Sequence, residues 1–355
     1  MVPVGGIEAF IHDIAAAVQD AGHQLRLVCW GPPTEQLHRL TERGADIRRS
    51  SFRWGCRLAL PDFLRLPGGL IALRDQDLVL FTKVPPSPVL WALRGLSAKL
   101  GRPPFVYVTA YRPSEMWSPE GPSHAVLDAF DAIIVQVATF RNDLQRFGYR
   151  GRVAVIPLLP PDPGPATPFP DTGTRLRLGF LGRLVPQKDV SALLQVFAHL
   201  CHTPTGGNWE LHLFGDGPDR ARLEALAHEL AIGESVTFHG SIERDLVPSA
   251  IDSCHMFAFT SRSEGQCLAA LEILARGRPV IATPVGAFPD LLSHSVLGEV
   301  CPVDDPAHFA SLIEKICASI ALSRLAPQEV QDRFKRKFSR EVIAKKYVSF
   351  FDSLI

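Results

Sequence analysis

The sequence lacks three features that would each have pointed to a particular class of protein. None of its seven cysteines belongs to a CxxC pair, so neither a zinc site nor a disulfide framework is indicated. No run of about 18–20 apolar residues occurs, so no membrane-spanning helix is expected. Charge of one sign does not predominate either, since 37 Lys and Arg balance 37 Asp and Glu. No protein-wide field therefore attracts nucleic acid, and any anion site must be local.

Two further observations bear on where the protein works. Scattered thiols in a long chain fit a reducing compartment. The first residues, 1–6, lack the basic-then-apolar pattern of a signal peptide. We therefore expect a cytoplasmic protein, with peripheral contact at the inner face of a membrane as an extension of that expectation.

Strand-like and helix-like patterns alternate along the 355 residues, which is long enough for two domains. This alternation is typical of βαβ units, and it predicts parallel sheets covered by helices on both faces. The strand-like segments are residues 24–30, 77–82, 105–109, 131–137, 177–180, 210–214, 235–238, 256–259 and 279–282. The clearest helical segments are residues 7–21, 139–147, 190–200, 219–230, 268–276, 306–320 and 339–354.

Seven prolines crowd residues 157–170 and interrupt this alternation. Proline lacks an amide donor and disfavours helix in the residue before it, so this stretch predicts a semi-rigid linker. The resulting division is an N-terminal domain over residues 1–158, a linker over 159–172, a C-terminal domain over 173–325 and a helical segment over 326–355.

The most informative stretch is T-S-R-S-E-G-Q-C-L-A-A-L-E, residues 260–272. A strand ends near its start, a turn containing Gly265 follows, and a helix begins around Cys267 or Leu268. Free N–H groups at a helix start form a cradle for phosphate. Glu264 and Glu272 can face the same cavity, where carboxylates suit sugar and ribose diols. On spacing alone, a surface turn with an exposed helical glutamate is equally consistent.

Three shorter motifs add to this stretch. L-G-F-L-G-R-L-V-P-Q-K-D places Arg183 and Lys188 after a strand that ends at Gly182, where two cations can clamp a diphosphate. Solvated surface cations are the plainer interpretation. Tight or flexible turns are indicated by the glycine pairs Gly215 with Gly217 and Gly5 with Gly6.

In this order, the four motifs resemble the GT4 family of GT-B glycosyltransferases: G-G-x-E, G-R-L-x-x-x-K, G-x-G-P, and E-x7-E followed by A-R-G-R-P-V-I-A-T. The resemblance covers nearly everything from Arg175 to Leu354. It implies a GT-B fold of two Rossmann-like α/β domains, each with a doubly wound parallel sheet, facing a cleft. It also implies a retaining glycosyltransferase that uses a UDP- or GDP-linked sugar and a saccharide or lipid-linked acceptor.

The resemblance also implies a role for each matching residue. Arg183 and Lys188 would neutralise the leaving diphosphate, Glu264 would contact the donor sugar, and Glu272 would bind the ribose. The distal phosphate would be held by the amides of three consecutive residues, Gln266, Cys267 and Leu268. The remaining donor-side positions are Gly5, Gly6, Gly182, Gly215, Gly217, Ile242 and Gly265. No cofactor and no metal is expected, because the two cations stabilise the developing charge.

Three departures from the family pattern are visible. Only residues 1–4 precede the G-G-x-E motif, so we expect an N-terminal domain that lacks its first strand. A histidine frequent after the strand at 105–109 is replaced by T-A-Y-R, in which Tyr111 and Arg112 are poor substitutes. His12 and His124 are better interpreted as ordinary histidines. Gln266-Cys267 stands where Phe-Gly is frequent, a change that backbone contacts should survive.

Alternatives remain open. A degenerate nucleotide-sugar-binding protein without activity would explain the first two departures, and a nucleotide-sugar 2-epimerase shares the fold. A Rossmann dehydrogenase is disfavoured because no G-x-G-x-x-G motif follows a strand. Residues 47–57, I-R-R-S-S-F-R-W-G-C-R, could rest on an anionic membrane, although a solvated basic loop is the simpler interpretation.

Overall fold

The computed structural model describes residues 6–24, 26–29, 42–49, 76–81, 87–98, 103–109, 124–160, 162–171, 175–202 and 208–355. The chain forms two compact units. The N-terminal unit comprises Met1–Leu159 and Ile343–Ile355, and the C-terminal unit comprises Pro160–Val342. The domain boundaries at residues 158, 172 and 325 stay predictions.

The N-terminal unit contains a parallel sheet whose strand order follows the sequence. Its strands are β3 (Val79–Phe81), β4 (Phe105–Val108), β5 (Ala132–Val135) and β6 (Arg152–Val155). A separate parallel pair joins β1 (Arg26–Cys29) to β2 (Asp46–Arg49). Every side chain of β4 and β5 is buried. The continuous apolar runs FVYV and AIIV thus belong to strands covered on both faces.

The helices of this unit are α1 (Gly6–Asp20), α5 (Ser87–Ser97), α7 (His124–Leu127), α8 (Ala138–Arg146) and most of α16 (Arg340–Asp352). The start of α16 is capped by Ser339, whose Oγ accepts a bond from the amide of Val342 at 3.2 Å. Farther along, the buried Tyr347 hydroxyl donates to the carbonyl of Ile156 at 3.3 Å. The last helix is therefore anchored beside the end of β6.

The C-terminal unit is built on six parallel strands in the order β12-β11-β10-β7-β8-β9. They are β7 (Leu176–Leu181), β8 (Trp209–Phe214), β9 (Val236–Gly240), β10 (Met256–Phe259), β11 (Val280–Ala282) and β12 (Gly298–Val300). The chain winds outward from β7 in one direction and then from β10 in the other. Ligands bind at the carboxyl ends of strands where such a reversal occurs, so the β7–β10 junction positions the site.

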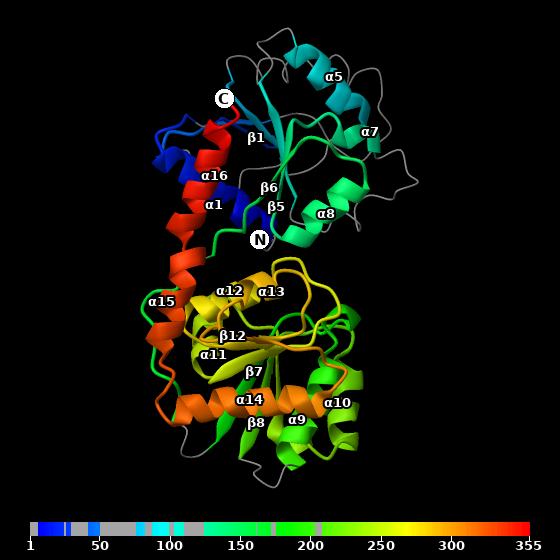
Figure 1. Cartoon of the computed structure of the whole chain (residues 1–355), viewed down its shortest axis with the longest axis vertical. Helices are drawn as coiled ribbons and strands as arrows, with labels where there is room; N and C mark the ends of the chain where they lie inside the picture. The colour runs from blue at the N-terminus through cyan, green and yellow to red at the C-terminus, as the bar shows by residue number, and fades with distance from the viewer. Residues whose placement is uncertain are drawn as a thin grey trace. The chain divides into compact units, whose positions relative to one another are not determined.

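Helices cover both faces of this sheet, with α9 (Val190–His202), α10 (Arg220–Glu229) and α14 (Pro306–Ala321) on one face (Figure 1). The other face carries α12 (Leu268–Ala275) and α13 (Phe288–Leu291). Helix α15 (Pro327–Phe338) packs against α12, and α11 (Val247–Asp252) connects β9 to β10. Short 3-10 turns occur at η1 (Pro186–Lys188), η2 (Gly233–Ser235) and η3 (Arg244–Leu246).

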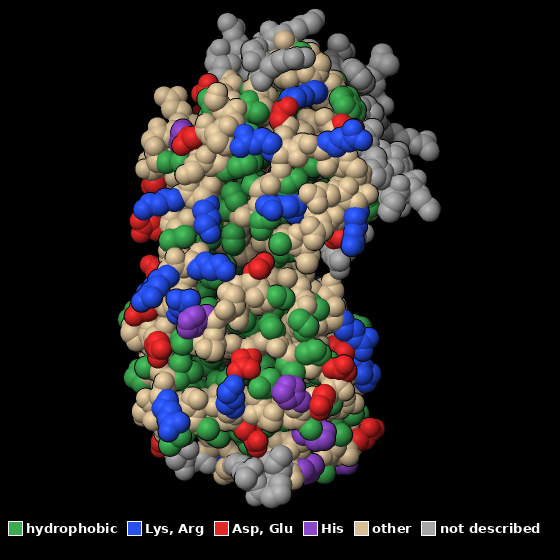
Figure 2. All heavy atoms as spheres, viewed as in Figure 1, with side chains coloured by type: hydrophobic (Ala, Val, Ile, Leu, Met, Phe, Trp, Pro, Cys, Tyr) green, Lys and Arg blue, Asp and Glu red, His purple; other side chains and the backbone are tan. Residues whose placement is uncertain are grey.

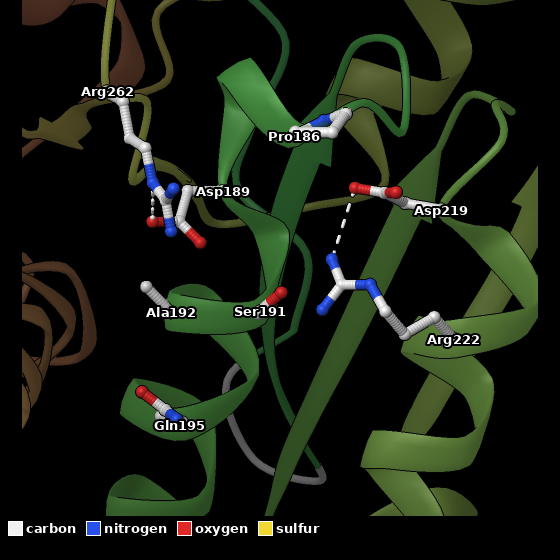
Figure 3. Close-up of a pocket in the computed structure, with 8 residues that line it drawn as sticks. All are labelled: Pro186, Asp189, Ser191, Ala192, Gln195, Asp219, Arg222 and Arg262. Atoms are coloured by element: carbon white, nitrogen blue, oxygen red, sulfur yellow. Dashed lines mark hydrogen bonds and ion pairs between the residues drawn. The ribbon is translucent and has the colours of Figure 1, made fainter.

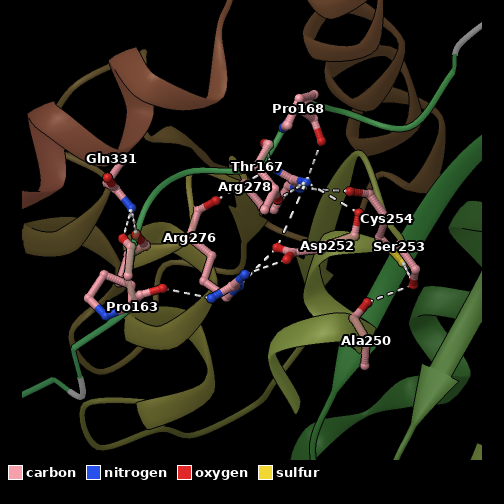
Figure 4. Close-up of polar contacts among 12 residues, drawn as sticks. Pro163, Thr167, Pro168, Ala250, Asp252, Ser253, Cys254, Arg276, Arg278 and Gln331 are labelled. Carbon is pink, nitrogen blue, oxygen red and sulfur yellow. Dashed lines mark hydrogen bonds and ion pairs between the residues drawn. The ribbon is translucent and has the colours of Figure 1, made fainter. Parts of the chain in front are cut away.

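Residues 163–168 of the proline-rich segment are bonded to the rest of the C-terminal unit (Figure 4). Arg278 is fully buried and donates to the carbonyl oxygens of Thr167 and Pro168 at 2.9 and 2.8 Å. Arg276 donates to the carbonyl of Pro163 at 2.7 Å and pairs with Asp252. Burial lowers the pKa of Arg278 to about 10, so it still carries its charge at neutral pH. The prolines remove amide donors, and the arginines satisfy the carbonyls that remain.

Within the part of the chain that the structure describes, no helix is both long and apolar enough to span a bilayer. Acidic and basic side chains are mixed on the face drawn in Figure 2, as their equal numbers lead one to expect.

Candidate functional site

Two loops meet at the β7–β10 junction, one following β7 and one following β10. Lys188, at the end of η1, donates from Nζ to Oε1 of Glu264 at 2.6 Å. Ser261 donates its hydroxyl to the same oxygen at 2.7 Å. Glu264 is only 6% exposed. A carboxylate buried to this extent needs an ion-pair partner and hydrogen bonds, and Glu264 has both.

Three further hydrogen bonds, all accepted by backbone carbonyls, join the same two loops on either side of this ion pair. The amide of Arg262 donates to the carbonyl of Gln187 at 2.9 Å, and the Gln187 side chain donates to the carbonyl of Ser263 at 2.9 Å. The hydroxyl of Thr260 donates to the carbonyl of Asp189 at 2.8 Å. The loops that carry Lys188 and Glu264 are therefore joined by neighbouring hydrogen bonds as well as by the ion pair.

The turn that carries Glu264 also has a specific backbone requirement. Gly286 has a φ of +58°, and a Cβ there would lie 2.4 Å from the carbonyl oxygen of Gly265 and 2.5 Å from that of Glu264. Glycine alone permits this approach. The amide of Ala287 donates to the Gly265 carbonyl at 3.0 Å, and this bond holds the turn against the segment that follows β11.

The turn leads into α12, whose N-cap is Cys267, with a left-handed φ of 54°. Leu268 is the first helical residue and is exposed, whereas Gln266 is buried. The amides at this start have no partner inside the helix, as at any helix N-terminus. Burial, and next the charge of Glu264, raise the pKa of the Cys267 thiol to about 12, so it stays protonated at neutral pH.

Glu272 lies one turn farther along α12 and is 8% exposed. Its partner is Arg244 of η3, whose Nη2 lies 2.7 Å from Oε1. Burial raises the pKa of Glu272, and the charge of Arg244 and its bond to the carboxylate oppose that rise. The two glutamates of the E-x7-E motif thus have separate cationic partners.

The glycines of the first two C-terminal motifs lie together for a structural reason. The turn after β8 packs on the backbone after β7, so that a Cβ on Gly215 would lie 1.9 Å from the carbonyl oxygen of Gly182. A Cβ on Gly217 would lie 2.2 Å from the carbonyl oxygen of Leu184. These glycines shape the loop that carries Arg183 and Lys188.

Other expected site residues are not brought into this contact. Arg183 is exposed, and it belongs to none of the ion pairs found among the described residues. Ile242 is half-buried after β9. Gly6 begins α1 in the N-terminal unit, whereas Gly5 lies outside the described residues, as do Tyr111, Arg112 and residues 50–57. His12 lies 3.5 Å from its neighbour Asp13, and His124 is the first residue of α7.

A hollow of about 460 Å³, which the motifs did not indicate, lies beside these loops (Figure 3). It lies between the starts of α9 and α10, and none of the expected site residues lines it. Its two arginines are each paired with an aspartate, Arg262 with Asp189 at 2.7 Å and Arg222 with Asp219 at 3.1 Å. The hollow therefore offers little uncompensated charge to an anion.

Sequence reasoning also missed Arg244, which belongs to none of the motifs. The described residues contain no group of three or more His, Cys, Asp or Glu side chains placed to hold a metal ion. That no metal or cofactor takes part stays a prediction.

Comparison with known proteins adds to this geometry. A family model described as "Glycosyl transferases group 1" matches residues 170–327, and one described as "Glycosyl transferase 4-like domain" matches residues 5–159. Together they span most of the chain.

Among curated relatives, D-inositol 3-phosphate glycosyltransferase of Corynebacterium jeikeium (strain K411) is 28% identical over 245 residues, 62% of this chain and 58% of that protein. Lipopolysaccharide 1,6-galactosyltransferase of Escherichia coli (strain K12) is 30% identical over 156 residues, 42% of each chain. The chain thus spans about half the length of the curated relatives it matches.

Two solved structures resemble the whole chain. The apo form of the lipopolysaccharide outer core galactosyltransferase WaaB has a TM-score of 0.74 at 18% identity and covers 100% of this chain and 98% of its own. Anabaena HepE in complex with UDP and glucose has a TM-score of 0.70 at 18% identity and covers 98% and 96%. These likenesses, with sheets of four and six parallel strands, confirm the expected GT-B fold.

Proposed function

We propose, because this chain belongs to the glycosyl transferases group 1 family, that it transfers a sugar from a nucleotide diphosphate sugar to an acceptor. The observation that carries this proposal is the Lys188–Glu264 ion pair at the sheet's reversal point. A fold alone names no reaction, but a cation and a buried acid at this edge suit a sugar diphosphate.

In this proposal each residue acts on the donor. Lys188, with the exposed Arg183 of the same loop, stabilises the negative charge that develops on the diphosphate as the glycosidic bond breaks. Glu264 binds the donor sugar, and Glu272 binds the ribose. The amides of Gln266, Cys267 and Leu268, at the start of α12, bind the distal phosphate.

The finer assignments rest on the resemblance to the family. We propose transfer with retention of configuration, without a metal, from a UDP- or GDP-linked sugar to a saccharide or lipid-linked acceptor. Of the two nucleotides we favour UDP, because HepE was solved in complex with UDP and glucose. We also propose a cytoplasmic location with peripheral contact at a membrane, because a lipid-linked acceptor would lie in that membrane.

Donor binding and hydrolysis test the proposal. Purified full-length protein should bind UDP or GDP in calorimetry and should slowly hydrolyse the matching nucleotide sugar in the presence of EDTA. The variant E264Q should retain nucleotide binding and lose most of the hydrolysis. Binding without hydrolysis by the wild type, with no transfer to any glycan tried, would support the degenerate binding protein instead. Absence of binding would contradict both.

A further inference from the structure

The second acid of the site has an unusual partner. Glu272 is nearly buried, and its Oε1 is held at 2.7 Å by Arg244, a side chain that is itself 72% exposed. Arg244 is the first residue of η3, which follows the edge strand β9. No other cation within the described ranges lies at ion-pair distance from Glu272.

A carboxylate accepts hydrogen bonds from a diol best when it is ionised. The ionised form accepts through both oxygens, whereas the protonated form turns one oxygen into a donor. Burial favours protonation of a carboxylate, and a cation in contact favours ionisation. For Glu272 both influences are present and opposed.

We propose that Arg244 is a positioning residue for the nucleotide: it holds Glu272 ionised and oriented through Oε1, so that the second oxygen is ready for a ribose hydroxyl. This inference rests on the proposed function, since it assigns a residue to the same donor site. Arg244 acts through Glu272 and need not touch the reacting atoms.

The surroundings of Glu272 leave this task to Arg244. A titratable neighbour on the same turn is the thiol of Cys267, which stays protonated at neutral pH and brings no positive charge. Of the other cations of the site, Lys188 is engaged with Glu264, and Arg183 is exposed and forms no described ion pair with Glu272. Removing Arg244 therefore leaves Glu272 with burial alone, and its pKa must rise.

The variant R244Q tests this inference, and R244K is its charge-conserving counterpart. The matched control is K315Q, because Lys315 is 67% exposed and pairs at 2.9 Å with Glu299 of the edge strand β12. Binding of UDP and of GDP is measured by calorimetry at about pH 6 and about pH 8 on the full-length protein. Where the pH lies well below the pKa of Glu272, each unit by which that pKa rises weakens binding by up to about tenfold.

The expected result is a change in pH dependence and not merely a loss of affinity. R244Q should weaken nucleotide binding more at the lower pH than at the higher, by up to about tenfold for each unit by which the pKa of Glu272 rises. R244K should restore most of the affinity, and K315Q should follow the wild type at both values. If the wild type binds normally and R244Q loses the same affinity at both pH values, or loses none, the proposed role of Arg244 is overturned while the proposed function stands. A wild type that binds neither nucleotide would overturn the proposed function and this inference with it.

Discussion

Lys188 Nζ and Glu264 Oε1 lie 2.6 Å apart although 76 residues separate them in the sequence. Each follows a different strand of the same sheet, and those strands, β7 and β10, are direct neighbours. The fold thus places a cation against a buried acid where parallel strands end, and the loop-to-loop bonds around Thr260 and Gln187 keep them there. Such preorganised charge is the usual source of electrostatic catalysis.

Replacement of Lys188 by alanine should abolish most of the activity. The change removes the cation proposed to stabilise the leaving diphosphate, so kcat for donor hydrolysis should fall by about 10²–10³-fold. It also leaves Glu264 buried with the Ser261 hydroxyl as its remaining partner among the described residues, so the midpoint of urea unfolding should fall as well. Steady-state hydrolysis and urea titration measure the two effects.

The double variant K188A/E264Q separates these effects. A neutral glutamine needs no counter-charge, so the double variant should recover part of the lost stability while remaining inactive. Activity close to wild type in K188A, with its unfolding midpoint lowered, would show that the ion pair serves only the fold.

Substitution of Gly215 by alanine should disrupt the loop that carries Arg183 and Lys188. The φ of Gly215 is +137°, and an added Cβ would overlap the backbone carbonyl of Gly182 at 1.9 Å. Both strain and overlap are present, so we expect a loss of about 1–3 kcal/mol in the free energy of unfolding. Chemical denaturation measures it.

Gly233 provides the matched control. A Cβ there would meet nothing closer than the Cα of His228 at 4.0 Å, so G233A should change the unfolding free energy by less than about 0.5 kcal/mol. Equal effects of the two substitutions would contradict the close packing of the turn after β8 on the loop after β7.

The elements that sequence patterns predict well are those with a strong apolar period. The strand expected over residues 256–259 coincides with β10, and the helix expected over 268–276 ends one residue later than α12. Strand β12 escapes such patterns because it is three residues long, with one of them buried. Helix α15 lies within the helical segment expected over residues 326–355, and its buried residues Val330, Phe334 and Phe338 recur every four residues.

The site was predictable to the extent that it depends on loops after strands. The motifs place Lys188 and Glu264 after two strands, and only the strand order makes those strands neighbours. The pairing of Glu272 with Arg244 joins η3 to α12, and no local spacing indicates it. The glycines at 215 and 217 are explained by the packing of one backbone on another, which a single sequence does not display.

Replacement of Arg278 by methionine should release the proline-rich segment. The carbonyls of Thr167, Pro168 and Cys254 would lose their donor, and each buried unsatisfied group costs about 1–3 kcal/mol. We expect the unfolding free energy to fall by at least about 2 kcal/mol. Elastase, which cuts after small residues, should then cleave after Ala166, beside Thr167, whose carbonyl the Arg278 guanidinium binds in the intact protein. The control variant is R324M, because Arg324 is exposed. Resistance of R278M to cleavage would contradict the role of Arg278 in holding the proline-rich segment.

The pair formed by His212 and His239 should make the stability of the C-terminal unit depend on pH. Their ring nitrogens Nδ1 and Nε2 lie 2.9 Å apart on neighbouring strands, and Glu210 and Arg177 lie on the same side. Burial lowers the pKa of both histidines, and the nearby Arg177 adds to this for His212, while Glu210 opposes it. The neutral rings are therefore favoured in the folded state.

The sign of the effect follows from proton binding. Between the lowered folded pKa values and the unfolded value of about 6.5, the unfolded chain binds more protons than the folded one. Stability is thus fully present above about pH 6.5 and is lost as the pH falls through the folded values.

The variant H239Q removes one of the two groups, so its unfolding free energy should fall less steeply below that pH. The control T237V lies on the same strand and does not titrate, so its pH profile should run parallel to that of the wild type. Urea titrations at several pH values measure the slopes, and parallel profiles for H239Q and the wild type would contradict the coupling of the two rings to folding.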